Sequence, residues 1–258
     1  MAKFTSVCRD DVPAASTYQG PREASGVRWS KALSPPGYSL WLCESELDDG
    51  GTVTWGREHG DDAVYVFEGA LDVDGHVCPA GGAVIVESGA ACVARAVGAT
   101  RIAHYGCASD APPSNGLFRP PKPDGHGVHV LGPGGHALSG AREGVKATWF
   151  ADSTCDTCRC ALLLVENEHE MKAPSHHHSE DEIIFLIRGA ITMGAYTYGA
   201  GTALSIPGNA RYGFTGLAGG HAFLNFRRDA SNQTNGRDEE PMLETALARG
   251  GELVDDVR

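Results

Sequence analysis

The most restrictive feature of this 258-residue sequence is an internal repeat, in which two stretches of the chain match at an offset of 120 residues. Tyr65-Val-Phe-Glu-Gly69 aligns with Phe185-Leu-Ile-Arg-Gly189, and Pro79-Ala-Gly81 aligns with Gly199-Ala-Gly201 without an insertion. A fixed period of this kind marks copies of one structural unit. The 34 glycines and 14 prolines favour short strands joined by tight turns. We therefore expect two similar, all-β domains.

A cluster of potential metal ligands lies in the second copy, within Pro174-Ser-His-His-His-Ser-Glu-Asp-Glu182. In an extended chain, alternate side chains point to the same side, so His176, His178 and Glu182 are predicted to converge while His177 points away. Two imidazoles and one carboxylate are a typical ligand set for Fe(II), and the same donors also hold Zn, Mn, Ni or Cu. The pattern indicates a site for one divalent metal.

This stretch resembles the first motif of the cupin family, which reads His-x-His, three or four residues, Glu, six residues, Gly. His176, His178, Glu182 and Gly189 fit it without a gap. The second cupin motif is also present, except that Tyr212 stands where its histidine is expected. The resemblance implies a bicupin with two jelly-roll barrels, and a metal held by His176, His178 and Glu182 with Tyr212 in or beside the ligand shell.

The first copy lacks these ligands. At the offset of the repeat, the four positions correspond to Gly56, Glu58, Asp62 and Cys92. We therefore expect no metal in the first barrel. His59 is one residue out of phase with the inward-facing set, and such a slip turns a side chain to the opposite face. We expect His59 to be a turn or surface residue.

The repeat and the turn residues also predict the domain boundaries. We expect an N-terminal barrel with its arm over residues 1–108, a linker rich in proline and glycine over 109–144, and a C-terminal barrel over 145–258. Within the linker interval, Val128–Leu131 is predicted to be a short strand that leads into the second barrel. The first 35 or so residues are expected to pack outside a barrel or across a dimer partner. Residues 240–250 combine an early proline, apolar residues at helical spacing and a final glycine, which predicts a short C-terminal helix.

The charge of the chain limits its partners. With 33 acidic and 21 basic residues the net charge is −12, which argues against nucleic acid and anionic membranes. No segment approaches the roughly 20 apolar residues of a membrane span, and the N-terminus has no apolar signal region. We expect a cytoplasmic protein that acts on a small molecule, and a homodimer if exposed sheet edges pair.

Three further residues are weaker candidates for the site. His221 shares strand parity with Phe223 and Asn225, so it is a candidate ligand or catalytic base. The alternative, which we favour, is a core histidine satisfied by a hydrogen bond. Arg211 and Arg227 are candidates for binding a substrate carboxylate, although solvated surface arginines are commoner.

The cysteines form a second chemical signal. Cys155, Cys158 and Cys160 include a Cys-x-x-Cys pair, which can bind zinc or form a redox disulfide. Structural zinc needs four ligands, and no second pair at the usual spacing is present. We therefore favour small, apolar thiols here, as expected in a reducing compartment.

The reaction is left with three alternatives. The leading hypothesis is an Fe(II) dioxygenase whose small oxygenated substrate chelates the metal while Tyr212 manages a proton. The second is a non-redox lyase or isomerase in which Zn, Mn or Ni acts as a Lewis acid. The third is a binding protein without turnover. The missing fourth histidine and the altered first copy argue against the oxalate-decarboxylating bicupins.

Overall fold

The structure is a computed structural model, which describes residues 4–108, 125–135, 137–142, 145–152, 155–228, 232–235, 241–243 and 253–257. Within these ranges the chain forms strands and one short 3-10 helix, η1 (Arg9–Asp11). No helix of this described part has the length and hydrophobicity that crossing a membrane requires.

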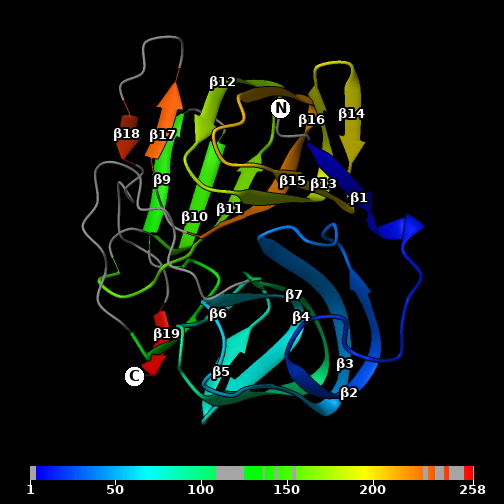
Figure 1. Cartoon of the computed structure of the whole chain (residues 1–258), viewed down its shortest axis with the longest axis vertical. Coiled ribbons are helices and arrows are strands. Elements are labelled where there is room, and N and C mark those ends of the chain that lie inside the picture. The colour runs from blue at the N-terminus through cyan, green and yellow to red at the C-terminus, as the bar shows by residue number, and fades with distance from the viewer. Residues whose placement is uncertain are drawn as a thin grey trace.

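The strands form two antiparallel sheets, each curled into a barrel, and the barrels lie one above the other in Figure 1. The first sheet contains β2 (Glu23–Ala32), β3 (Leu40–Trp55), β4 (Asp62–Val73), β5 (His76–Pro79), β6 (Ala83–Val86), β7 (Cys92–Cys107), β8 (Val128–Leu131) and β19 (Leu253–Val257). The second contains β1 (Thr5–Cys8), β9 (Ala137–Arg142), β10 (Val145–Ala151), β11 (Ala161–Asn167), β12 (Met171–His178), β13 (Glu182–Met193), β14 (Tyr196–Gly199), β15 (Thr202–Ile206), β16 (Tyr212–Arg227), β17 (Asn232–Asn235) and β18 (Pro241–Leu243).

The predicted repeat is confirmed by the strand boundaries. Strands β4 and β13 begin and end 120 residues apart, and so do β7 and β16. The strand order also repeats, because β6-β4-β7-β3 in the first sheet corresponds to β15-β13-β16-β11 in the second. Gly69 and Gly189 lie at matching irregularities within β4 and β13, where the pairing register shifts, with φ of +76° and +70°. The two copies therefore share one topology.

A single apolar core joins the two barrels. On β4, Ala63 and Tyr65 belong to this shared core, whereas Val64 belongs to the interior of the first barrel. On β13, Phe185 points to the shared core and Ile184 to the interior of the second barrel. Strands buried on both faces read as continuous apolar runs rather than alternating ones. This explains why the apolar runs in the repeat are uninterrupted.

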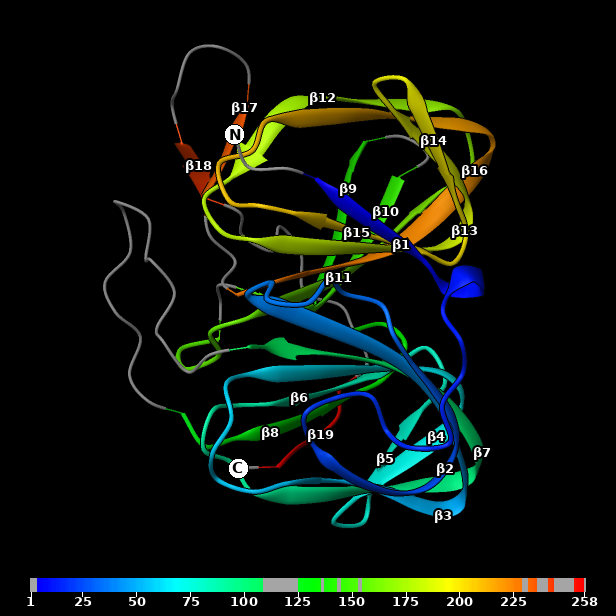
Figure 2. The ribbon, with the colours of Figure 1, turned by 45° about the vertical axis from the view of Figure 1, so that its right-hand side comes forward.

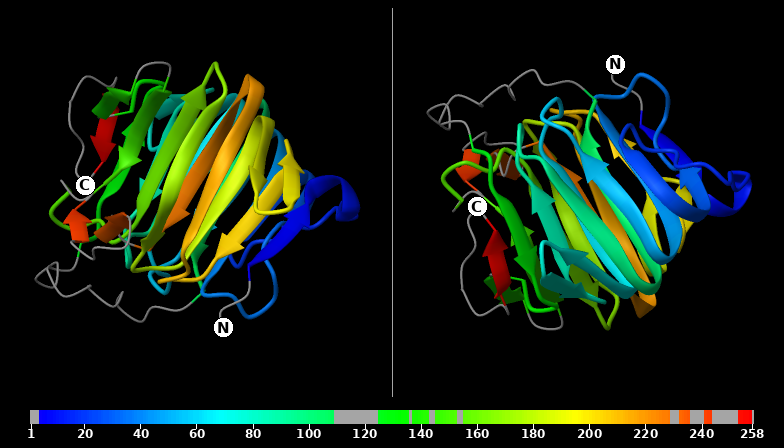
Figure 3. Two further views of the ribbon diagram at one scale, coloured as in Figure 1. Left: turned by 90° about the horizontal axis from the view of Figure 1, so that it is seen from above. Right: turned by 90° about the horizontal axis from the view of Figure 1, so that it is seen from below.

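The terminal strands are exchanged between the barrels. Strand β1, from the N-terminal arm, pairs with β15 of the second barrel, and β19, from the C-terminal end, pairs with β8 of the first. Figure 2 shows the blue β1 beside β15 and the red β19 beside β8, and Figure 3 shows the same crossing from above and below. Each barrel is therefore completed by a strand that the sequence assigns to the other.

Two predicted segments differ from the structure. The interval 109–144, read as a linker, contains β8, which joins the first sheet, and β9, which joins the second. Strand β8 was expected, but as a strand leading into the second barrel rather than as part of the first sheet, and β9 was not predicted. The predicted helix over residues 240–250 does not begin as one, because Pro241–Leu243 forms β18 and pairs with β17. Its residues 244–250 lie outside the described residues.

The register shift at Gly189 in β13 gives a first prediction. A Cβ there would clash with the carbonyl oxygen of Gly220, and the positive φ adds backbone strain. Gly189→Ala is expected to lower the free energy of unfolding by about 3 kcal/mol or more. Gly194→Ala, with positive φ but open space, should lose about 1 kcal/mol. Gly199→Ala, with ordinary φ and open space, should be nearly neutral. Urea denaturation of the three variants measures this, and equal losses would contradict the steric explanation.

Candidate functional site

The pairing of strands brings the predicted site residues to one end of the second barrel. His176 is opposite Tyr212 in the register of β12 and β16, and Glu182 is opposite Arg227 in the register of β13 and β16. His178 lies two residues beyond His176 on β12. The side chains of all five are buried. The fold therefore brings these five residues into one neighbourhood, and their convergence on a metal ion stays a prediction.

The aromatic rings of the cluster are in contact. The ring centroids of His176 and His178 are 5.2 Å apart, and that of Tyr212 lies 4.4 Å from His176. Nδ1 of His176 is 2.8 Å from the carbonyl oxygen of Pro174. A backbone carbonyl that holds one ring nitrogen directs the other to a ligand. His176 is thus oriented to offer Nε2.

The donors fit a divalent ion in part. Nε2 of His178 lies 3.9 Å from Oε2 of Glu182, and an ion with bonds of about 2.1 Å holds ligand atoms up to about 4.2 Å apart. The ligand atoms of His176, His178 and Glu182 do not all lie within 4.8 Å of one another. Among the described residues, another group of side chains meets that condition. The His178 and Glu182 pair suits one ion, and the His176 ring would have to move closer.

Arg227 is a fifth member of the cluster that we expected on the surface. Its side chain is only 1% exposed, and Nη1 donates to the ring of His178 at 2.7 Å from Nδ1. The reason is strand parity, since Phe223, Asn225 and Arg227 alternate with residues of the shared core along β16. Arg211 is exposed, as expected.

The cluster fixes the protonation state of His178 and the orientation of Glu182. Burial, followed by the charge of Arg227, holds the pKa of His178 well below its usual value. His178 is therefore neutral near pH 7, which a metal ligand requires. Because Nδ1 accepts from Arg227, the ring proton is on Nε2, and binding an ion through Nε2 would require Arg227 to release Nδ1. Nδ2 of Asn225 donates to Oε2 of Glu182 at 2.8 Å, which orients the carboxylate.

His221 lies away from this cluster. It pairs with Gly189 and is six residues from Arg227 along β16, a separation of about 20 Å. Its ring stacks on Phe223 with centroids 5.9 Å apart, and neither ring nitrogen has a hydrogen-bond partner among the described residues. The structure therefore does not bring His221 to the predicted ligands, and it does not supply the hydrogen bond we expected of a core histidine.

The first barrel differs at the matching position. Asp62, which corresponds to Glu182, accepts hydrogen bonds from Arg22 at 2.6 Å and from Trp55 at 2.8 Å, and lies 3.2 Å from His104. Burial alone would raise the pKa of Asp62, but the bonds from His104 and Arg22 lower it overall. The carboxylate is thus bound to a cation of the protein itself.

His59 lies in the loop after β3, outside any strand, but it is buried rather than on the surface. It is only 4% exposed, and its ring nitrogens lie 2.6 Å from the carbonyl oxygens of Gly60 and Ala90. A carbonyl oxygen only accepts, so a neutral ring donates to one of the two, and this hydrogen bond offsets the burial of the ring. Its position follows from the loop after β3 rather than from strand parity.

Residues of the first barrel also contact the backbone of the second barrel's site, which no sequence motif indicates. The hydroxyl of Tyr38 is 3.1 Å from the carbonyl oxygen of Glu182 and 2.7 Å from that of Ile206. Ser39 donates to Asp181, whose other carboxylate oxygen accepts from the Gly208 amide at 2.7 Å. The loop between β2 and β3 therefore holds the start of β13, where Glu182 lies, and the end of the neighbouring strand β15.

The cysteines have polar neighbours that we did not expect. Cys155 and Cys158 lie with Glu87 and His129, and the four ligand atoms are within 4.8 Å of one another. A hydrogen bond from the Cys158 thiol, which outweighs burial, lowers the pKa of Cys155 to about 3. Cys160 lies in the shared apolar core, as predicted for a small apolar thiol.

The buried His178 gives a prediction on pH. The unfolded imidazole has a pKa of about 6.5, whereas the folded one is held well below this. Below pH 6.5 the unfolded state takes up a proton that the folded state refuses, so stability falls by up to about 1.4 kcal/mol per pH unit until the folded pKa is reached. His178→Gln should show a flatter decline in urea denaturation between pH 6.5 and 5.5 with a chelator present. Identical slopes would contradict the assignment.

No protein-family model and no curated protein sequence matches this chain. Solved structures do match it. A variant of Bacillus subtilis oxalate decarboxylase is 16% identical, with a TM-score of 0.64, and the match covers 89% of this chain and 78% of that one. A second structure, from a study of the Mn(II) centres of the same enzyme, is 15% identical, with a TM-score of 0.63 and the same coverage. At this identity the likeness concerns the fold, and the chain has the all-β, cupin-type jelly-roll fold of oxalate decarboxylase.

Proposed function

We propose that the second barrel binds a divalent metal through His176, His178 and Glu182 and acts on a small anionic substrate by non-redox, lyase-type or isomerase-type chemistry. The observation that carries this proposal is the buried Arg227 guanidinium beside His178. A buried cation next to candidate metal ligands is suited to a substrate carboxylate.

The charges of the cluster favour an anion. Glu182 and Arg227 carry opposite charges, and His178 is neutral near pH 7. A divalent ion held there would leave the site with an excess of positive charge in a buried environment. Such a site is stabilised by a negatively charged ligand. A carboxylate or dicarboxylate is thus the substrate class that we propose.

The comparisons support the non-redox alternative over our first hypothesis. The structurally similar enzyme is a decarboxylase, and one of its structures is described by its Mn(II) centres. Iron and dioxygenase activity gain no support from these neighbours. We therefore favour manganese among the metals that the donor set allows.

Each residue of the cluster has a proposed role. A bound divalent ion would act as a Lewis acid on a substrate oxygen. Arg227 would bind the carboxylate through its two-pronged guanidinium, and Asn225 keeps Glu182 oriented through its 2.8 Å hydrogen bond. The Tyr212 phenol, in ring contact with His176, is the group placed to give or take a proton.

The proposal is tested on untagged protein loaded anaerobically with Mn(II), Fe(II) or Zn(II). A panel of monocarboxylates, dicarboxylates including oxalate, keto acids and catechols is followed for product formation and for O₂ uptake. Turnover of a carboxylate with Mn(II) and no net O₂ consumption supports the proposal. Stoichiometric O₂ consumption with Fe(II) and a substrate of the panel would support the dioxygenase hypothesis instead. Metal binding without turnover would indicate a binding protein.

Arg227→Lys is expected to raise KM for an anionic substrate about 10-fold to 100-fold with a smaller change in kcat. Lysine keeps the charge but loses the paired hydrogen bonds, which contribute about 1.5–3 kcal/mol. The control is Arg211→Lys, since Arg211 is exposed near the same end of the barrel. Steady-state kinetics of both variants decides the point, and an unchanged KM in Arg227→Lys rules out carboxylate binding by this residue.

Tyr212→Phe is expected to retain the metal and to lower kcat by about 100-fold, because general acid or base groups contribute about 10²–10⁴-fold. Tyr198→Phe is the matched control, since Tyr198 packs at the edge of the same apolar cluster. Metal content and kcat are measured on both proteins. A Tyr212→Phe enzyme that keeps full kcat shows that the phenol has no role in proton transfer.

A further inference from the structure

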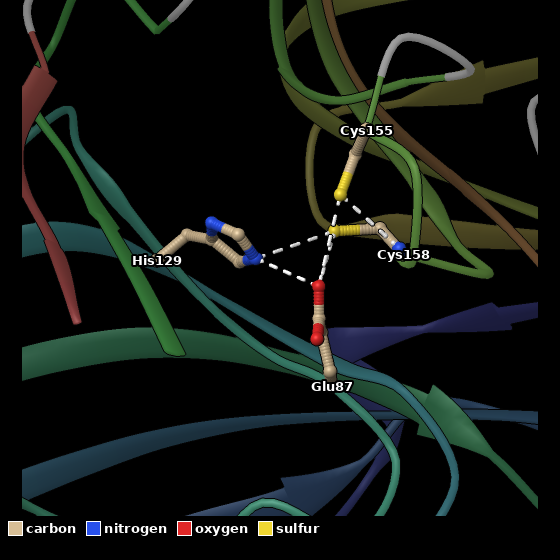
Figure 4. A group of neighbouring side chains, drawn as sticks. All are labelled: Glu87, His129, Cys155 and Cys158. Carbon is tan, nitrogen blue, oxygen red and sulfur yellow. Dashed lines mark hydrogen bonds and ion pairs between the residues drawn. The ribbon is translucent and has the colours of Figure 1, made fainter. Parts of the chain in front are cut away.

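A second cluster of ligand-type side chains lies between the two barrels, away from His176 and His178. Glu87 follows β6, and His129 lies on β8, so both belong to the first barrel. Cys155 and Cys158 lie in the connection between β10 and β11 of the second. Figure 4 shows the four side chains pointing toward one another from these separate segments. Residues from both barrels therefore meet at one point.

The direction of His129 follows from its strand. Its neighbours Val128 and Val130 belong to the interior core of the first barrel. Because successive side chains of a strand point to opposite faces, His129 faces the second barrel. Glu87 is fixed by the Gly127 amide, which donates to Oε2 at 2.7 Å and leaves Oε1 toward the cysteines. Both first-barrel donors are thus held in place before any ligand binds.

The distances match a tetrahedral zinc site. With usual zinc bond lengths to sulfur, nitrogen and oxygen, the edges of the tetrahedron measure about 3.4–3.8 Å. Sγ of Cys158 is 3.3 Å from Oε1 of Glu87 and 3.5 Å from Nε2 of His129. Sγ of Cys155 is 3.7 Å from the same Glu87 oxygen. The edge between His129 and Glu87, 2.9 Å, is shorter because these two atoms share a hydrogen bond.

The surroundings of the cysteines fit thiolate ligands. The Cys158 amide donates to Sγ of Cys155 at 3.1 Å, and a hydrogen bond from a backbone amide stabilises a sulfur that carries negative charge. The Thr157 hydroxyl donates to Oε1 of Glu87 at 2.5 Å. Hydrogen bonds of this kind orient the residues that bind a metal.

We propose that Glu87, His129, Cys155 and Cys158 bind one zinc ion that fastens the two barrels together. Two thiolates, one imidazole and one carboxylate complete a four-coordinate shell. A shell made wholly of protein ligands leaves no position for substrate, so the ion has a structural role. The sequence offered only the Cys-x-x-Cys half of this set, and the docking of the barrels supplies the other half.

A Cys155–Cys158 disulfide is the competing use of the same pair. It would take both sulfurs and leave the buried Glu87 and His129 without a role in the cluster. Zinc uses all four donors. The two possibilities differ in metal content and in the mass of the protein, so they can be separated by experiment.

The first experiment measures the zinc content of untagged protein by mass spectrometry of the metal, for wild type and three variants. Wild type is expected to hold about one zinc per chain after dialysis against a weak chelator. Cys158→Ser should lose it. Cys160→Ser, the same change two residues away in the apolar core, should retain it. His178→Ala should also retain it, which separates this site from the one proposed in the second barrel.

Replacement of zinc by Co(II) gives a second readout that does not depend on folding of a variant. The proposal predicts the visible absorption of tetrahedral cobalt together with thiolate-to-cobalt charge transfer. Removing the metal with a strong chelator should lower the melting temperature of wild type but not of Cys158→Ser. The proposal is overturned if wild type binds no zinc when reduced and loaded, if Cys158→Ser keeps the full zinc content, or if anaerobically purified protein contains the Cys155–Cys158 disulfide in place of metal.

Discussion

The apolar core between the two sheets is the interaction on which the rest of the structure depends. One face of β4 and one face of β13 pack in this core, while the opposite face of each strand packs in the interior of its own barrel. Ala63 and Phe185 thus contribute to contact between the barrels, and Val64 and Ile184 to the barrel interiors. Since hydrophobic burial is the dominant favourable term in folding, neither sheet is expected to be stable without the other.

This mutual dependence explains why the first barrel persists without the histidines of the second. Its Tyr38 holds the carbonyl groups of Glu182 and Ile206, which fixes the strands at the candidate site. At the position that matches Glu182, Asp62 instead binds Arg22. In the first copy, the residue that matches Glu182 thus forms an internal ion pair. The first barrel contacts the candidate site through hydrogen bonds to backbone carbonyl groups. The two copies thus share their strand order and differ in the residues at the site positions.

The sequence allowed prediction of whatever depends on local period and on the repeat. Even spacing determines the shared face of His176 and His178 on β12, whereas Glu182 begins the next strand, β13, and is brought near them by the intervening turn. The register of β12 with β16 adds Tyr212. Burial of Arg227 was not predictable from residue type, because it depends on which face of β16 fills the barrel. Strand β8 was expected as a short strand, but its sheet was predicted wrongly, because four residues carry no sign of the strand with which they pair. The partners of Cys158 were missed because they lie on another barrel and have no motif of their own.

The two clusters differ in how buried charge is balanced, and this difference argues for different roles. In the second barrel, the Arg227 guanidinium lies within the cluster itself, so an added divalent ion creates a positive excess that an exchangeable anion can neutralise. Between the barrels, two thiolates and the carboxylate of Glu87 surround the neutral imidazole of His129, so the donors are negatively charged and a zinc ion neutralises most of that charge without a further anion. An ion bound only by the docked barrels adds its binding free energy to their association. The first arrangement suits turnover of a ligand, and the second suits a permanent bond between the halves of the chain.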